Sequence, residues 1–220
     1  MPRVGTSMTT LRVDTWNDIV CPWCYVGEAR LRKAAAALGP DVQVEIHPHA
    51  FELDPNHEHP EQVLDMLARK YGRTQEQARA MDSQVARLAA EEGLPYTSDR
   101  VTVNTFNAHR LIAAAQEVGA KLDLLHALQR GHFSGEIDLS DPHALVAAAV
   151  GVGMSEGRAR QVLEGDDYAD QVRDDAATAR SLGVTGVPFT VIAEKFAIPG
   201  CVEVSQYEMG LRRGLEASAQ

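Results

Sequence analysis

Two cysteines, Cys21 and Cys24, stand where a short strand is expected to give way to a helix. Residues 11–15 alternate apolar and polar side chains, as a strand does, and apolar residues then recur at helical spacing over 31–38. Strict alternation returns over 42–46. A strand–helix–strand unit of this length is expected to cross over right-handed and to place its two strands parallel. The pattern therefore predicts an α/β domain built around the cysteine pair.

The position of the pair suggests which sulfur attacks. A sulfur must be a thiolate to attack a disulfide, and unpaired N–H groups at a helix N-terminus favour negative charge. Cys21 opens the predicted helix and is the expected nucleophile. Cys24 lies one turn further on, close enough to resolve a mixed disulfide. Pro22 suits the first turn because it lacks an N–H that would be unpaired there.

A zinc site is the alternative interpretation of a C-x-x-C pair. Structural zinc takes four ligands, commonly two such pairs. The chain has three cysteines and no second C-x-x-C, which leaves Cys201 alone. A site could be completed on paper by His47, His49, His57 and His59, but the last two lie in a Pro- and Asn-rich stretch. We therefore favour redox chemistry and expect no metal.

A second motif lies far along the chain, at Gly186-Val187-Pro188-Phe189. A proline that follows Gly-Val just ahead of a strand is suited to a cis peptide bond, which is uncommon. If this loop lies opposite the dithiol, the backbone of Val187 can pair with an extended substrate. Pro188 brings no N–H to compete for the sulfur.

The segment between the two motifs has helical patterns only, from Pro60 to about residue 182. Thr74 with Gln77 resembles a capping box, and Asp141-Pro142 places a cap before a proline at the first helical position. Asn104 or Thr105, Ser155 and Asp167 are further candidate caps. Strands are expected again over 187–192 and 196–198, followed by a closing helix. We therefore predict a domain of residues 11–60 and 184–220, interrupted by a helical domain of residues 61–183.

Composition limits the kinds of partner that we expect for this protein. The 220 residues carry a net charge of −10, whereas nucleic-acid binders usually show a basic patch. Met1–Thr10 has one Arg and no apolar stretch typical of a secretory signal, and no apolar run approaches the ~20 residues that span a bilayer. Three cysteines are also too few for a secreted fold that is held together by several disulfides. We expect a cytoplasmic protein that binds neither nucleic acid nor membrane.

Five motifs together resemble the DsbA-like thioredoxin-fold proteins, and most closely the FrnE subfamily. They are spread over almost the whole chain. They are the runs Asp18–Gly27, Phe51–Pro55, Lys70–Gly72, Asn104–Leu111 and Gly186–Phe189.

The resemblance implies a thioredoxin fold with an all-helical domain inserted after the second strand. It also implies Cys21 as attacking thiol, Cys24 as resolving thiol and Pro188 as a cis residue. Two relatives, 2-hydroxychromene-2-carboxylate isomerase and the kappa-class glutathione transferases, share this scaffold but normally lack the second cysteine. The presence of Cys24 therefore favours a thiol–disulfide redox function. The chain departs from the family at Gly200-Cys201-Val202 and at His49-Ala50, which bears on substrate preference.

We also make hypotheses about the roles of four further residues. Asp18 either assists proton transfer from Cys24 or ends the strand as an acceptor. The family's helical cap makes His109 a candidate base or thiolate partner, although an ordinary packed helix residue is the simpler interpretation. Trp23 is expected to flank the site, and it replaces a histidine that would make the couple more oxidising. Cys201 is either a packed apolar side chain or a third partner in exchange.

The predicted function is thiol–disulfide exchange with protein or small thiol substrates. Glutathione or another thiol is a possible co-substrate, a reductase of unknown identity restores the dithiol, and no other cofactor is expected. Two alternatives remain. One is an isomerase or tailoring enzyme for a small aromatic or polyketide-type molecule, an expectation by analogy; the other is a non-catalytic stress chaperone.

Overall fold

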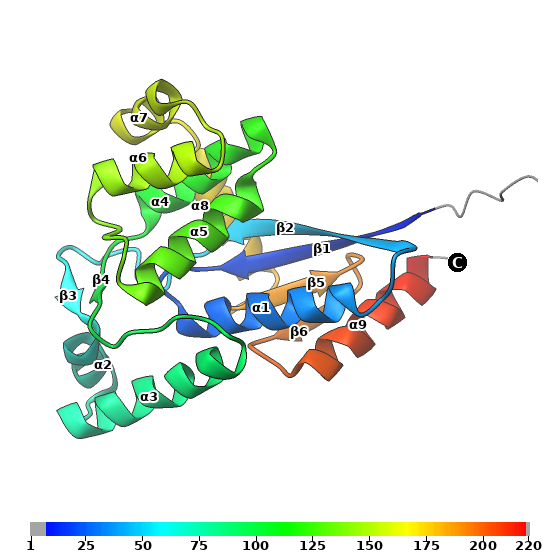
Figure 1. Cartoon of the computed structure of the whole chain (residues 1–220), viewed down its shortest axis with the longest axis horizontal. Helices are drawn as coiled ribbons and strands as arrows, with labels where there is room; N and C mark the ends of the chain where they lie inside the picture. Colours follow the sequence, from blue (N-terminus) through cyan, green and yellow to red (C-terminus); the bar gives the residue numbers. More distant parts are fainter. Residues whose placement is uncertain (1–7, 219–220) are drawn as a thin grey trace, which may run out of the picture.

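A four-stranded mixed sheet forms the centre of the molecule. The computed structural model describes residues 8–218. The strands β1 (Thr9–Asn17), β2 (Val42–Ala50), β5 (Phe189–Ile192) and β6 (Phe196–Pro199) are ordered β2-β1-β5-β6 (Figure 1). β1 runs parallel to β2 and antiparallel to β5. The predicted parallel strand–helix–strand unit is therefore present, and the C-terminal hairpin completes the sheet.

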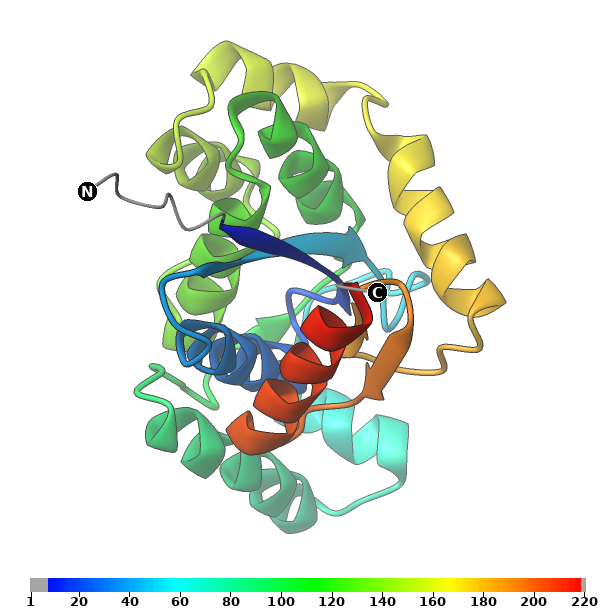
Figure 2. The same cartoon turned by 90° about the vertical axis from the view of Figure 1, so that its right-hand side faces the viewer.

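Two helices cover one face of this sheet. They are α1 (Pro22–Ala36) and α9 (Val204–Ser218), which pack against each other and run side by side in both views (Figures 1 and 2). Their apolar sides enclose a core formed by Leu11, Val13, Leu31, Ala34, Ile192, Tyr207 and Leu211. The alternation seen in the sequence of β1 follows from this core, because Leu11 and Val13 point to the same face.

Helix α8 (Ala169–Ser181) packs on the opposite face of the sheet. Asp175 of α8 accepts a hydrogen bond from the Ala50 N–H at 3.0 Å, and its backbone carbonyl accepts one from Trp16 Nε1 at 3.0 Å. His49 lies between two carboxylates, 3.0 Å from Asp175 Oδ1 and 2.8 Å from Asp14 Oδ1. α8 thus contacts both the sheet and the helical segment, and the predicted boundary at residue 183 stays a prediction.

The remaining helices belong to the insertion, and some of them share a second core. They are α2 (Val63–Tyr71), α3 (Gln75–Glu91), α4 (Phe106–Ala114), the short 3-10 helix η1 (Ala115–Val118), α5 (Lys121–Ser134), α6 (Pro142–Gly151) and α7 (Glu156–Glu164). Leu111, Leu124 and Leu128 are fully buried in the cluster that α4 to α7 share. The fold is therefore the predicted thioredoxin fold with a large helical insertion after β2.

Several of the predicted helix caps are present. Thr74 and Gln77 form a reciprocal capping box at the start of α3. Asp141 Oδ1 accepts from the His143 N–H at 2.9 Å, and Ser155 Oγ accepts from the Arg158 N–H at 3.2 Å. Each cap pairs an N–H that the first turn leaves free, which is why local sequence alone was sufficient to find it.

Three expectations about local structure were wrong. Residues 60–182 are not helical only, because β3 (Glu61–Gln62) pairs antiparallel with β4 (Val101–Thr102). Asp167 does not cap α8, since the helix begins after Tyr168, which has a left-handed φ of 64°. The strand β5 begins at Phe189 rather than at residue 187, because the two preceding residues form a loop.

Two expectations drawn from composition concern the N-terminus and the membrane. Residues 1–7 of the stretch Met1–Thr10 lie outside the described residues. Over residues 8–218, no helix combines the length and the apolar character that crossing a bilayer requires.

Candidate active site

Cys21 occupies the N-cap of α1. Its backbone is extended, with φ −82° and ψ 112°, and Pro22 follows at the first helical position. The Cys21 N–H donates to Asp18 O at 3.2 Å, and its carbonyl accepts from the N–H groups of Cys24 and Tyr25. The side chain makes no capping hydrogen bond and is only 2% exposed. The sulfur therefore sits at the positive end of the helix, as predicted from its position in the motif.

Cys24 is fully buried beneath Cys21 in the first turn of α1. Burial holds the pKa of the Cys24 thiol well above its usual range, and the neighbouring Cys21 sulfur raises it further. A thiol with a raised pKa stays protonated and is a poor nucleophile at neutral pH. The two sulfurs thus lie in different surroundings, which suits an attacking thiol and a protonated resolving thiol.

The loop before β5 lies against the Cys21 sulfur. The Val187–Pro188 peptide bond is cis, as expected from the sequence. The Cys21 Sγ thiol lies 3.7 Å from Val187 O, within the range of a weak sulfur hydrogen bond. The Pro188 carbonyl accepts from the Gly200 N–H at 2.8 Å, which ties this loop to the end of the hairpin. The two distant motifs therefore form one site.

Asp18 and His109 form a buried pair beside the cysteines. Asp18 is 1% exposed and His109 is 3% exposed. His109 Nε2 lies 3.3 Å from Asp18 Oδ1, while Asp18 Oδ2 accepts from the Leu53 N–H at 2.8 Å. Asp18 also lies close enough to Cys24 to affect the pKa of that thiol. A carboxylate in this place has the chemistry of a proton acceptor for Cys24.

Glu52 is a third ionisable residue near this pair. Burial raises the pKa of Glu52, an effect that His109 opposes and Asp18 reinforces. Its Oε1 is buried without a hydrogen-bond partner among the described residues. Sequence reasoning did not single out Glu52, although it belongs to the quoted run Phe51–Pro55.

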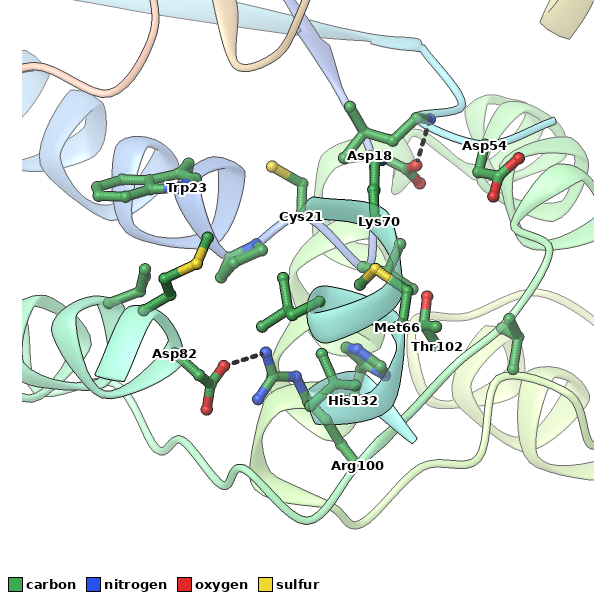
Figure 3. A pocket seen from close by; sticks show the side chains of 18 of the residues that line it. Asp18, Cys21, Trp23, Asp54, Met66, Lys70, Asp82, Arg100, Thr102 and His132 are labelled. Atoms are coloured by element: carbon green, nitrogen blue, oxygen red, sulfur yellow. Dashed lines mark hydrogen bonds and ion pairs between the residues drawn. The ribbon is translucent and has the colours of Figure 1, made fainter. Parts of the chain in front are cut away.

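A pocket of about 220 Å³ opens beside Cys21, between the sheet domain and the inserted helices. Cys21 and Trp23 lie at one end of it (Figure 3), and Trp23 is 38% exposed. Asp82, Arg100 and His132 lie at the other end (Figure 3). Most of the wall is apolar and comes from Val20, Leu53, Val63, Met66, Leu67, Met81, Val85 and Val103.

The charged groups at the far end of the pocket pair with one another. Arg100 donates to Asp82 Oδ1 at 2.9 Å and to Tyr96 Oη at 2.8 Å, and Ser98 Oγ donates to Asp82 Oδ2 at 2.5 Å. Burial, with the nearby Arg100 cation, lowers the pKa of His132 to about 3. His132 is therefore neutral near pH 7. The Arg100 charge is paired with Asp82, although Arg100 Nε has no hydrogen-bond partner among the described residues.

Cys201 lies next to the site on its other side. Cys201 and Pro188 both lie close to Gly27 of α1. A Cβ placed on Gly27 would be 3.7 Å from Cys201 Cβ and 3.2 Å from Pro188 Cγ. Cys201 packs against the apolar cluster that contains Val26 and Val85. Burial raises the pKa of its thiol, which Arg30 partly offsets. These surroundings fit the interpretation of Cys201 as a packed side chain.

The residues that the sequence predicted for the catalytic and substrate-binding site come together at one place. They are Asp18, Cys21, Pro22, Trp23, Cys24, His109, Val187 and Pro188. The pocket end formed by Asp82, Arg100 and His132 was missed, because these residues are far apart in sequence and share no motif. Over residues 8–218, no group of three or more His, Cys, Asp or Glu side chains is arranged so that it could hold a metal ion.

The thioredoxin fold and the dithiol beside a cis-proline loop define the class as oxidoreductases of the thioredoxin fold. The chain belongs to the DSBA-like thioredoxin domain family, whose sequence profile matches residues 12–212. The predicted family is thus confirmed, and its FrnE subfamily stays a prediction.

Solved structures of similar proteins agree with this assignment. A probable DsbA oxidoreductase from Streptomyces coelicolor is 41% identical, with a TM-score of 0.88 over 94% of this chain and 90% of that one. The cytosolic disulfide reductase DsbM from Pseudomonas aeruginosa is 16% identical, with a TM-score of 0.59 over 95% of this chain and 97% of that one. At this identity, DsbM is similar in fold alone.

Curated relatives add little about activity. The uncharacterized protein YwbO of Bacillus subtilis is 25% identical over 92% of this chain and 96% of its own length. Cytidylate kinases of Rhodococcus opacus and Rhodococcus jostii are 31% identical over 107 and 100 residues. The chain spans less than half the length of these kinases, and its sequence contains no Gly-Lys pair of the kind found in a phosphate-binding P-loop.

Proposed function

We propose that this protein exchanges disulfide bonds with protein or small thiol substrates through Cys21 and Cys24. The observation that carries the proposal is the contrast between the two sulfurs. Cys21 sits at the N-cap of α1, 3.7 Å from the Val187 carbonyl, while Cys24 is fully buried and its pKa is raised. One thiol is placed to attack and the other is held protonated until it is needed.

The first step is attack by the Cys21 thiolate on a substrate disulfide. A bond forms between Cys21 Sγ and one substrate sulfur, and the second substrate sulfur leaves as a thiolate. The backbone of Val187 lies beside the new disulfide and offers a carbonyl to an extended substrate segment. This arrangement supports binding of a peptide-like substrate along the loop.

The second step resolves the mixed disulfide. Cys24 gives up its proton, and we propose the buried carboxylate of Asp18, which acts on the pKa of this thiol, as the acceptor. The Cys24 sulfur then attacks Cys21 Sγ, a Cys21–Cys24 disulfide forms, and the remaining substrate sulfur leaves. The substrate has gained two electrons and the enzyme has lost two. Two molecules of a small thiol such as glutathione, which leave joined as a disulfide, or a dithiol reductase then restore the dithiol. The same steps in reverse donate a disulfide.

Reduction of insulin by dithiothreitol, with and without the protein, tests this proposal. We expect the wild-type chain to accelerate it, and Cys21→Ser to return the rate to the uncatalysed background. Cys24→Ser still attacks, so it should accumulate a mixed disulfide at Cys21 that mass spectrometry detects. Cys201→Ser is the matched control and should keep the wild-type rate, since Cys201 is a packed side chain. A wild-type rate equal to the background contradicts redox catalysis and leaves the small-molecule enzyme and the stress chaperone as alternatives.

A second candidate is an enzyme for a small aromatic or polyketide-type molecule. The observation in its favour is the apolar pocket of about 220 Å³ against a Cys21 that is only 2% exposed. Pockets for small molecules are mostly apolar with a few placed polar groups, and this pocket has that character. Turnover of such a molecule that survives Cys24→Ser would favour this candidate over disulfide exchange. The cytoplasmic location stays a prediction for either function.

A further inference from the structure

The segment that follows β2 contributes to two separate cavities. Leu53 and Asp54 line the pocket beside the dithiol. Phe51 and Glu52, just before them, line instead a groove of about 490 Å³, which residues of α8 and the start of α4 complete. Among the described residues, none lines both cavities. The groove is therefore a space apart from the dithiol pocket, although neighbouring residues of one segment reach both.

The backbone on each side of Glu52 is fixed close to Asp18. The Leu53 N–H donates to Asp18 Oδ2 at 2.8 Å, and the Phe51 N–H donates to Asn17 O at 3.0 Å. Both chain neighbours of Glu52 are therefore hydrogen-bonded to the end of β1 and the turn that leads to the dithiol. These bonds hold Glu52 at a set place relative to Asp18.

The Glu52 carboxyl interacts with the buried Asp18–His109 pair and also reaches the groove. Burial raises the pKa of Glu52, and His109 and Asp18 both lie close enough to act on it. Glu52 Oε1 is shut off from solvent and has no hydrogen-bond partner among the described residues. The residue as a whole is nevertheless only half-buried and lines the groove. Glu52 thus has one side toward the interior and one toward water.

Asp18, His109 and Glu52 form a series of titratable groups from the dithiol to the groove. Asp18 lines the dithiol pocket and is 1% exposed. His109 Nε2 lies 3.3 Å from Asp18 Oδ1, and Glu52 lines the groove. In the resolution step, Cys24 loses its proton while the substrate is still bonded to Cys21, which lines the same pocket as Asp18. A route to the groove stays open when a substrate occupies that pocket.

We propose that Glu52 carries the Cys24 proton from the Asp18–His109 pair to the groove. This inference rests on the proposed disulfide exchange. The Cys24 S–H bond breaks and its proton binds Asp18, while the electron pair left on the Cys24 sulfur forms the bond to Cys21 Sγ. His109 takes the proton from Asp18 and passes one to the Glu52 carboxylate, which releases it to water in the groove. The relay moves a proton and no electrons, so it needs no further reactant.

A change of rotamer completes the transfer. The Glu52 side chain is half-buried at the groove, and rotamer changes of accessible side chains take picoseconds to nanoseconds. The carboxyl accepts a proton in its inner position and gives it up in its outer one. A purely structural role for Glu52 predicts no dependence of the reaction on small proton carriers, whereas a relay does.

A single turnover with a peptide disulfide, quenched rapidly and analysed by mass spectrometry, separates attack from resolution. Glu52→Gln should form the mixed disulfide at the wild-type rate and resolve it roughly tenfold more slowly. Glu52→Asp keeps a carboxylate and should recover most of the lost rate. Imidazole added to Glu52→Gln should accelerate resolution as its concentration rises. Glu58→Gln changes an exposed carboxylate of the same connection and should behave as the wild type does.

A double variant tests whether Glu52 and Asp18 act in one route. Adding Glu52→Gln to Asp18→Asn should slow resolution by less than about a further twofold, whereas independent effects would add in free energy. A wild type that forms no mixed disulfide contradicts both the proposed function and this route. If the mixed disulfide forms but Glu52→Gln resolves it at the wild-type rate, if imidazole gives no rescue, or if the two substitutions are additive, the relay alone is overturned.

Discussion

At the residue scale, the proposed chemistry depends on how differently the chain surrounds two identical thiols. Cys21 has the helix N-terminus and the Val187 carbonyl beside it, while Cys24 is fully buried, with Asp18 and the other sulfur close enough to act on its pKa. The sequence predicted these roles because a C-x-x-C at a helix start sets both positions by itself. The Asp18–His109 pair adds a group that can take the Cys24 proton.

Replacement of Asp18 tests that role. Asp18→Asn keeps an acceptor for the Leu53 N–H but cannot take up a proton, so resolution by Cys24 should slow by roughly 10²-fold. Rapid quenching should then show a longer-lived mixed disulfide at Cys21. Asp54 is a half-exposed carboxylate that lines the same pocket, which makes Asp54→Asn the matched control. An unchanged lifetime in Asp18→Asn would show that the proton leaves by another route.

His132 should make the stability of the protein depend on pH. Burial and Arg100 lower its folded pKa to about 3, whereas an unfolded histidine titrates near ~6.5. Between these values the unfolded chain binds a proton that the folded chain does not, so the free energy of unfolding falls as pH falls. The contribution is roughly 1.4 kcal/mol per pH unit.

Urea unfolding at several pH values measures this effect. His132→Phe should flatten the decline in the free energy of unfolding between about pH 6 and pH 4, relative to the wild type. His143→Phe removes an exposed histidine and should leave the decline unchanged. Equal slopes for His132→Phe and the wild type would mean that His132 is charged in the folded protein.

At the element scale, features set by neighbouring residues were predictable and features set by distant contacts were not. The capping box at Thr74 and the cap at Asp141 each depend on residues two or three positions apart. The β3–β4 pair joins residues about 40 positions apart and has only two residues in each strand, so no alternation reveals it. The pairing of Arg100 with Asp82 is hidden for the same reason.

The docking of α9 on the sheet depends on small residues. A Cβ on Gly214 would meet Ile192 Cγ2 at 2.5 Å and Leu11 Cδ1 at 3.3 Å, and both of these side chains are buried. Gly214→Ala should therefore destabilise the protein by roughly 1–3 kcal/mol through overpacking, despite a gain in helix propensity of up to ~1 kcal/mol.

Chemical denaturation of two glycine variants measures this balance. Gly157 of α7 has open space around its Cα, so Gly157→Ala receives only the gain in helix propensity. Its midpoint should equal or exceed that of the wild type, while the midpoint of Gly214→Ala should be lower. If Gly214→Ala proves as stable as Gly157→Ala, α9 does not pack on Ile192 as closely as described.

At the scale of the whole molecule, the insertion turns an open redox site into one with an adjoining pocket. Residues of α2 and α3 face Cys21 and Trp23 across the pocket (Figure 3), and neither half of the molecule forms it alone. The sequence predicted a helical segment near the site but not the lining of the pocket. That lining comes from segments that are distant in sequence and come together only when the insertion folds.

Filling the pocket should separate two kinds of substrate. Met66 projects into it from α2 (Figure 3), so Met66→Trp should slow attack by Cys21 on a small aromatic disulfide by roughly tenfold. Insulin reduction should change by less than about twofold, because in the proposed mechanism an extended segment lies along Val187 instead. Met209→Trp, on an exposed position of α9, is the control. A parallel loss of both activities in Met66→Trp would mean that protein substrates also use the pocket.

The central claim is that Cys21 and Cys24 form one reversible dithiol–disulfide couple. Its most direct test is equilibration of the protein with glutathione buffers of stepped potential, followed by alkylation and mass spectrometry. We predict that Cys21 and Cys24 lose their free thiols together, in a single two-electron transition, while Cys201 stays alkylatable throughout. The absence of a Cys21–Cys24 disulfide at every potential, or one that joins Cys201 instead, would contradict the account.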